Sequence, residues 1–142
     1  MESVIAMPIN DEERIRQILK EAKSIAVVGA SPKPWRDSGR IAQFLMEKGY
    51  TVFPVNPNYD EVLGRRCFPN LASIAQCVDV VDIFRRSEEM APIVEEAIRV
   101  GARTVWMQLG VVNPDAAARA EEGGLDVIMD RCIAIEYRRL IE

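Results

Sequence analysis

The sequence contains no histidine among its 142 residues. This absence excludes Ser-His-Asp and Cys-His catalytic triads, phosphohistidine chemistry and the commonest protein ligand of transition metals. Cysteine is also scarce, and Cys67, Cys77 and Cys132 form no Cys-x-x-Cys pair, so neither a disulfide framework nor a zinc site is expected. An enzymatic role would have to rely on carboxylates, lysine, tyrosine or cysteine.

Long apolar runs and an excess of basic residues are missing as well. No run approaches the length of a membrane-spanning helix, and residues 1–10 lack a basic segment followed by an apolar stretch. The net charge is −4, which disfavours bulk binding to nucleic acid or to an anionic membrane surface. We therefore expect a cytoplasmic protein that binds neither nucleic acid nor membrane.

What the sequence does contain is an alternation of apolar, strand-like runs with amphipathic, helix-like segments. Asn10 and Glu13 predict a capping box for a first helix, so that residues 1–23 pack on the domain. The pattern predicts an α/β fold in which residues 1–142 form a single Rossmann-like domain with a doubly wound, mostly parallel sheet. The predicted strands are 24–30, 50–55, 78–84, 103–109 and 126–129, and 56–70 is expected to be irregular.

The edge of such a sheet where the strands end is the expected ligand site, near the point where the strand order reverses. The segments expected at this edge are rich in basic residues although the protein is acidic overall, and Asp37 is the only compensating carboxylate expected there. This concentration favours a phosphate-rich ligand, and the alternative is that some of these side chains are simply solvated. The basic residues are Lys33, Arg36, Arg40, Arg85 and Arg86.

The exit of the first predicted strand is the most informative element. Backbone N–H groups of Gly29, Ala30 and Ser31 can approach a pyrophosphate at the start of a helix over 38–48. The dinucleotide fingerprint G-x-G-x-x-G is absent, because the next glycine after Gly29 is Gly39. A tight strand–helix turn without a ligand is the alternative.

The end of the second predicted strand discriminates among nucleotides. An NAD site needs an acidic residue there, but the chain reads Val55-Asn56-Pro57 and has no carboxylate before Asp60. Asn56 can bind a sugar or base without repelling a phosphate, which favours a phosphorylated adenosine such as that of coenzyme A or NADP. A plain turn is the alternative for Asn56-Pro57.

At this point the chain resembles the small stand-alone CoA-binding proteins, which are related to the CoA-binding domain of the succinyl-CoA synthetase α subunit. The resemblance extends from Ser24 to Leu140 and is carried by five stretches in the same order. These stretches are 25–31, 49–57, 80–85, 106–110 and 130–132, with 136–140 behind them.

The resemblance implies coenzyme A, free or acylated, as the ligand, with its parts arranged along the edge of the sheet. It implies that Trp106 lies in the core. The implied pyrophosphate contacts are Gly29, Ala30, Ser31, Arg36 and Ser38, and Asn56 is implied to lie near the ribose and its 3′-phosphate. The implied adenine contacts are Ile83, Phe84 and Arg85, and Arg86 could exchange roles with Arg85. Gln108 and Gly110 are implied to contact the pantetheine arm.

Cys132 follows the last predicted strand at the same edge, where the pantetheine thiol would arrive. Its thiolate would form a mixed disulfide with oxidised CoA, making the domain a thiol-state sensor or carrier. The alternative is a buried cysteine that acts as a small apolar residue. Cys67 and Cys77 are expected to be such packing residues.

The leading hypothesis is therefore a CoA- or acyl-CoA-binding module without complete catalytic machinery. The synthetase passes a phosphoryl group through a histidine, which this chain lacks, and its 142 residues leave no room for a ligase domain. A larger protein partner or a homo-oligomer would suit such a module. Two alternatives stay open: an NADP-binding oxidoreductase and a flavodoxin-like scaffold without a ligand.

Overall fold

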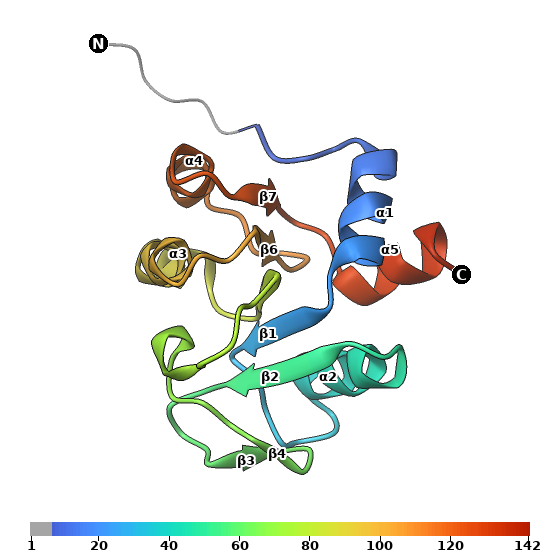
Figure 1. Cartoon of the computed structure of the whole chain (residues 1–142), viewed down its shortest axis with the longest axis vertical. Helices are drawn as coiled ribbons and strands as arrows, with labels where there is room; N and C mark the ends of the chain where they lie inside the picture. Colours follow the sequence, from blue (N-terminus) through green and yellow to red (C-terminus); the bar gives the residue numbers. More distant parts are fainter. Residues whose placement is uncertain (1–6) are drawn as a thin grey trace.

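Five parallel strands form the central sheet of the computed structural model, which describes residues 7–142 (Figure 1). The strands are β1 (Ser24–Val28), β2 (Thr51–Val55), β5 (Val80–Ile83), β6 (Thr104–Met107) and β7 (Asp126–Ile128). Their order across the sheet is β2-β1-β5-β6-β7, and every neighbouring pair is parallel. The order reverses between β1 and β5, which is the doubly wound, Rossmann-like arrangement that the alternation predicts.

Helices cover both faces of the sheet, as Figure 1 shows. On one face lie α1 (Glu12–Glu21), α2 (Asp37–Glu47) and α5 (Ile133–Leu140), and on the other lie α3 (Met90–Arg99) and α4 (Pro114–Glu122). Each face has its own hydrophobic core. Trp106 is fully buried in the core under α1, α2 and α5, as predicted. No helix within residues 7–142 is long and apolar enough to cross a membrane.

The first helix begins one residue later than the capping prediction requires. Asp11, not Asn10, is the N-cap residue, and its Oδ1 accepts a hydrogen bond from the Glu13 backbone nitrogen at 3.0 Å. Both side chains are good caps, and the burial of Ile15 and Leu19 against the sheet decides at which of the two residues the helix begins. The helix does pack on the domain; residues 1–6 of the predicted segment lie outside the described residues.

The stretch after β2 contains a small hairpin where an irregular segment is predicted. Strands β3 (Glu61–Val62) and β4 (Arg65–Arg66) pair antiparallel around Leu63 and Gly64, both of which have positive φ. Such a two-residue turn suits the twist of a hairpin. Two 3₁₀ turns follow along the chain, η1 (Leu71–Ser73) and η2 (Ser87–Glu89).

The three cysteines lie in three different environments. Cys67 is buried beside the hairpin, as predicted, whereas Cys77 is exposed, so its assignment as a packing residue is wrong. Only the backbone of Cys77 is used, because its carbonyl oxygen accepts a hydrogen bond from Ser24 Oγ at 2.9 Å. Cys132 is half-exposed.

Candidate ligand-binding site

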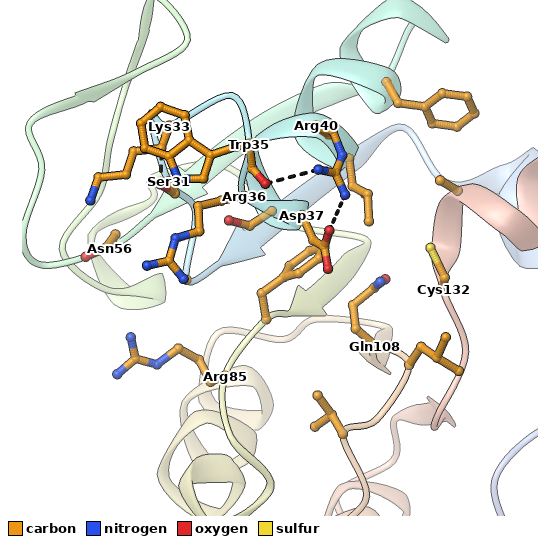
Figure 2. Close-up of a pocket in the computed structure, with 18 of the residues that line it drawn as sticks. Ser31, Lys33, Trp35, Arg36, Asp37, Arg40, Asn56, Arg85, Gln108 and Cys132 are labelled. Carbon is orange, nitrogen blue, oxygen red and sulfur yellow. Dashed lines mark hydrogen bonds and ion pairs between the residues drawn. The ribbon is translucent and has the colours of Figure 1, made fainter.

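A cavity of about 1030 Å³ opens where β1, β2, β5 and β6 end. It lies at the point where the strand order reverses, and α2 and α5 form part of its wall. Most of the residues predicted from the sequence line it, and Figure 2 shows several of them converging on the space. The predicted residues in its lining are Gly29, Ser31, Lys33, Arg36, Ser38, Asn56, Phe84, Arg85, Arg86, Gln108 and Cys132.

Three predicted residues are not brought to this cavity. Ala30 and Ile83 are fully buried, Ala30 in the core under α2 and Ile83 in the core on the opposite face of the sheet. Gly110 lies outside the lining, and its backbone nitrogen donates to Asp130 Oδ1 at 2.7 Å. The contacts of Ile83 with adenine and of Gly110 with pantetheine remain predictions that the lining of this cavity does not support.

The backbone amides at the exit of β1 are occupied. The N–H groups of Gly29 and Ala30 both donate to the carbonyl oxygen of Val55, with N···O distances of 2.8 and 3.3 Å. Both amides share this one acceptor at the end of the pairing between β1 and β2, so in this structure they are not free to hold a pyrophosphate as predicted. Glycine is nevertheless required at position 29, because a Cβ there would lie 2.6 Å from the Phe84 carbonyl oxygen.

Free amides occur one element later, at the start of α2. The N-cap residue of this helix, Arg36, makes no side-chain capping bond. The N–H groups of Asp37 and Ser38 have no hydrogen-bond partner among residues 7–142. Unpaired amides and the helix dipole together favour an anion at this position. The free backbone donors of this edge thus lie in the first turn of α2, whereas the amides at the strand exit are occupied.

The loop between β1 and α2 lies close against this first turn. A Cβ at position 39 would come within 2.8 Å of the Lys33 carbonyl oxygen and 3.0 Å of the Ser31 carbonyl oxygen, so only glycine fits. Ser31 Oγ accepts a hydrogen bond from the Lys33 backbone nitrogen at 3.1 Å. Gly39 belongs to no G-x-G-x-x-G fingerprint, and its structural role is this contact between loop and helix.

The basic residues of the cavity divide into paired and unpaired groups. Arg40 pairs with Asp37, the carboxylate expected at this edge. Lys33 and Arg36 have no carboxylate within 4.0 Å among the described residues. These two cations flank the free amides of α2, which gives this end of the cavity an unbalanced positive charge.

Two carboxylates that the sequence analysis overlooked partly neutralise the other arginines. Arg85 Nε lies 3.2 Å from Glu89 Oε2, and Arg86 Nε lies 3.6 Å from Glu88 Oε1. A hydrogen bond from the Arg86 backbone nitrogen, followed by the nearby arginine charges, lowers the pKa of Glu89. The prediction that Asp37 is the only compensating carboxylate is therefore wrong, and the positive end of the cavity is centred on Lys33 and Arg36.

The opposite end of the cavity holds an amide and a thiol. Gln108 is only 5% exposed, and its Oε1 accepts a hydrogen bond from the Ile133 backbone nitrogen at 3.0 Å. Its Nε2 has no hydrogen-bond partner among residues 7–142, and Figure 2 shows the amide end of the side chain turned into the cavity. Cys132, the N-cap residue of α5, borders both this cavity and an adjoining one of about 450 Å³.

Part of the lining comes from residues outside the set predicted to contact the ligand. Ile41 and Phe44 recur at helical spacing in α2, a pattern that indicates a buried face but does not say whether protein or ligand covers it. Residues next to Gln108 and close to Cys132 in the sequence also line the cavity. The additional lining residues are Trp35, Asp37, Arg40, Ile41, Phe44, Asn58, Tyr59, Leu109, Val111, Ala134, Ile135 and Arg138.

Comparison with known protein families agrees with the geometry of this edge. Residues 23–138 match the family model described as the CoA binding domain. The chain belongs to this CoA-binding family. The match covers all five strands of the sheet and both ends of the cavity.

Relatives of the family include both stand-alone chains and parts of larger proteins. The uncharacterized protein YneT of Bacillus subtilis is 40% identical over 123 residues, which cover 87% of this chain and 91% of that protein. The acetate–CoA ligase [ADP-forming] I of Archaeoglobus fulgidus is 27% identical over 80% of this chain, and the match covers only 18% of the ligase.

Solved structures show the same division. A hypothetical protein from Pyrococcus horikoshii OT3 superposes with a TM-score of 0.92 and 44% identity, with full coverage of both chains. The dinucleotide-forming acetyl-coenzyme A synthetase 1 of Ca. Korarchaeum cryptofilum gives a TM-score of 0.70 and 25% identity, and covers 84% of this chain but 28% of the synthetase. The fold prediction is confirmed by these neighbours.

Proposed function

We propose that this protein binds coenzyme A or its thioesters in the cavity at the carboxyl edge of the sheet, without turning the ligand over. The observation that carries the proposal is the pair of free backbone amides at Asp37 and Ser38, flanked by the unpaired cations Lys33 and Arg36. This combination suits a diphosphate. Membership of the CoA-binding family supports the same ligand.

The two ends of the cavity suggest the direction in which the ligand lies. In the proposed complex the pyrophosphate occupies the first turn of α2, and the phosphorylated adenosine lies toward Asn56 and Arg85. The pantetheine arm runs toward Gln108, whose free Nε2 would donate to one of its amide carbonyls, and ends near Cys132. Binding would give this free Nε2 a hydrogen-bond acceptor on the ligand, which favours the ligated state.

A role in binding alone is the economical proposal for these residues. The relative that is named a ligase is more than five times as long as the shared segment, since the match covers 18% of it. The ligase activity in that name belongs to the whole of the longer protein. We propose that this chain acts in the cytoplasm as a CoA-binding module, either with a larger protein partner or as a homo-oligomer.

Titration calorimetry tests the proposal directly. Wild-type protein is titrated with CoA, acetyl-CoA, 3′-dephospho-CoA and NADP. Heat with CoA or acetyl-CoA, weaker with 3′-dephospho-CoA and absent with NADP, is the expected result. Saturable heat with NADP alone would favour an oxidoreductase, and no heat with any of the four would leave a scaffold without a ligand; either result overturns the proposal.

A thiol-sensing role is a second candidate, favoured by the position of Cys132 on the wall of the cavity. In this reaction the Cys132 thiolate attacks one sulfur of CoA disulfide, the CoA S–S bond breaks, a protein–CoA disulfide forms and one CoA thiolate leaves. The guanidinium of the neighbouring Arg131 contacts Asn10 and lies 3.5 Å from Glu136 Oε1.

The exposed Cys77 provides a control within the same chain. After treatment with CoA disulfide, peptide mass spectrometry should find the CoA adduct on Cys132 and little on Cys77, which lies outside the cavity. Equal modification of the two thiols, or an adduct on Cys77 alone, would show that exposure and not ligand binding directs the reaction.

A further inference from the structure

Trp35 is a large aromatic residue that lines the cavity and has most of its surface in solvent. It is 68% exposed, whereas Trp106, the only other tryptophan, is fully buried. Figure 2 shows Trp35 on the side of the cavity that holds Lys33, Arg36 and Asn56, with Cys132 on the opposite side. An exposed indole at a ligand cavity is costly in water and gains stability when a flat apolar group covers it.

The loop that carries this indole is held in place by its own backbone. Pro32 and Pro34 fix their own φ angles and restrict the residues before them. The Trp35 carbonyl oxygen accepts a hydrogen bond from Arg40 Nη1 at 3.0 Å, and Arg40 also pairs with Asp37. The position of the Trp35 backbone at the edge of the cavity is thus set by proline geometry and by the contact with α2.

The neighbours of the indole indicate which part of a ligand it meets. Lys33 lies two residues before the indole and Arg36 directly follows it, and neither cation has a carboxylate within 4.0 Å among the described residues. A ligand that reaches both the cations and the ring must carry a planar group close to its phosphates. A purine nucleotide has this structure, whereas the pantetheine arm is flexible and not planar.

We propose that Trp35 is the stacking platform for the adenine base of the bound ligand, an inference that rests on the proposed CoA-binding function. It replaces the adenine contact that the resemblance implies for Ile83, whose side chain is fully buried. The adenosine end of the ligand then binds at Trp35, Lys33 and Arg36, and the site recognises 3′-phosphorylated adenine nucleotides even without pantetheine.

Two fragments of the ligand separate its ends. Adenosine 3′,5′-bisphosphate contains the base and two phosphates, and 4′-phosphopantetheine contains the arm. We expect the first to bind wild-type protein and to quench the long-wavelength emission of the exposed Trp35, and the second to bind weakly and leave this emission unchanged. Trp106 provides an internal reference, since its buried indole emits at shorter wavelength and reports that the core is intact.

Substitution of the ring tests the contact itself. Trp35→Leu should weaken binding of CoA and of adenosine 3′,5′-bisphosphate by about 5- to 100-fold, the usual range for loss of a stacked base, and Trp35→Phe should retain most of the affinity. Val112→Ala, at an exposed apolar residue outside the cavity lining, is the matched control and should leave both affinities unchanged.

The outcomes distinguish the two levels of the proposal. If Trp35→Leu binds CoA and the bisphosphate as tightly as wild type, the stacking role is wrong while CoA binding stands. If wild-type protein binds CoA with Trp35 emission unchanged, the adenine lies elsewhere and the inference is again overturned. If wild-type protein binds no CoA at all, the proposed function fails and the inference fails with it.

Discussion

The side-chain amide of Asn56 donates a hydrogen bond to the backbone carbonyl oxygen of Ala30, with 2.9 Å between nitrogen and oxygen. The Oδ1 atom of the same side chain accepts a hydrogen bond from the Asn58 backbone nitrogen, also at 2.9 Å. Asn56 is 7% exposed. One nearly buried side chain thus connects the loops that follow β1 and β2, and little of its hydrogen-bonding capacity remains for a ribose.

Asn56→Ala is therefore expected to act on stability more than on ligand contact. It leaves the Ala30 oxygen and the Asn58 nitrogen without partners, which costs about 1–3 kcal/mol in the free energy of unfolding. Urea denaturation measures this change, and Asn58→Ala, at an exposed side chain, is the control that should be nearly neutral. Equal stabilities for wild type and Asn56→Ala would contradict the role assigned to this linkage.

Gly29 offers a second test of how tightly the strand exits are packed. Its φ is +88°, and an added Cβ would lie 2.6 Å from the Phe84 carbonyl oxygen. Gly49 has a similar φ of +95° but nothing within 4 Å of the corresponding Cβ. Gly49→Ala should cost only the strain of the left-handed conformation, about 1–2 kcal/mol. Gly29→Ala should cost clearly more by thermal or urea unfolding, and a loss equal to that of Gly49→Ala would mean that Phe84 moves aside freely.

The strands and their edge were predictable because the signals are local. Each of the five strands is an apolar run bounded by polar or glycine residues, and the alternation with helices determines a parallel sheet. The carboxyl ends of the strands then gather Ser31, Asn56, Arg85, Gln108 and Cys132 at one edge. This inference needs the topology only, and the cavity lies at that edge.

The errors concern partners that lie far apart in the sequence. The amides of Gly29 and Ala30 look free in the sequence, and only the position of Val55 in three dimensions shows that they are occupied. The neutralisation of Arg85 by Glu89 was within reach, because an i, i+4 pair is a local signal. Trp35 had no signal of its own, since nothing in a single sequence tells an exposed aromatic ring from a buried one.

Asp82 is an unusual charge-bearing residue in the interior of the sheet. It lies between Val27 and Trp106 in the strand register and is fully buried, and neither carboxyl oxygen has a hydrogen-bond partner among the described residues. Burial raises the pKa of Asp82 well above its ordinary value of 3.8. The folded protein therefore holds this carboxyl protonated over a pH range in which the unfolded chain releases the proton.

This difference gives the stability a defined dependence on pH. At a pH below the pKa of Asp82 in the unfolded chain, both the folded and the unfolded state hold the proton, and the contribution of this carboxyl to the free energy of unfolding is fully present. As pH rises toward the folded pKa, unfolding releases a proton and stability falls by about 1.4 kcal/mol per pH unit. Asp82→Asn removes this titration, so the stability of the variant relative to wild type should increase as the pH is raised from about 4 through neutrality in urea unfolding, and should level off once the pH passes the folded pKa. A constant difference across this range would show that Asp82 does not change protonation on unfolding.

The charge balance of the cavity makes Arg36 the most informative position for ligand binding. Its guanidinium has no carboxylate partner among residues 7–142, and it is the N-cap residue beside the free amides of α2. Arg36→Gln should weaken CoA binding about 10-fold or more, because a hydrogen bond to a charged group is lost, and should reduce the dependence of the affinity on salt.

Arg119 provides the matched control for Arg36, since it pairs with Glu95 at 2.6 Å and lies outside the cavity lining. Arg119→Gln changes the net charge by the same amount and should leave the affinity for CoA unchanged. Arg36→Lys, which restores a cation without the planar fork, should recover part of the loss. If titration calorimetry at low and high salt finds equal losses for Arg36→Gln and Arg119→Gln, only the overall charge of the protein matters, and the phosphate position at the start of α2 is wrong.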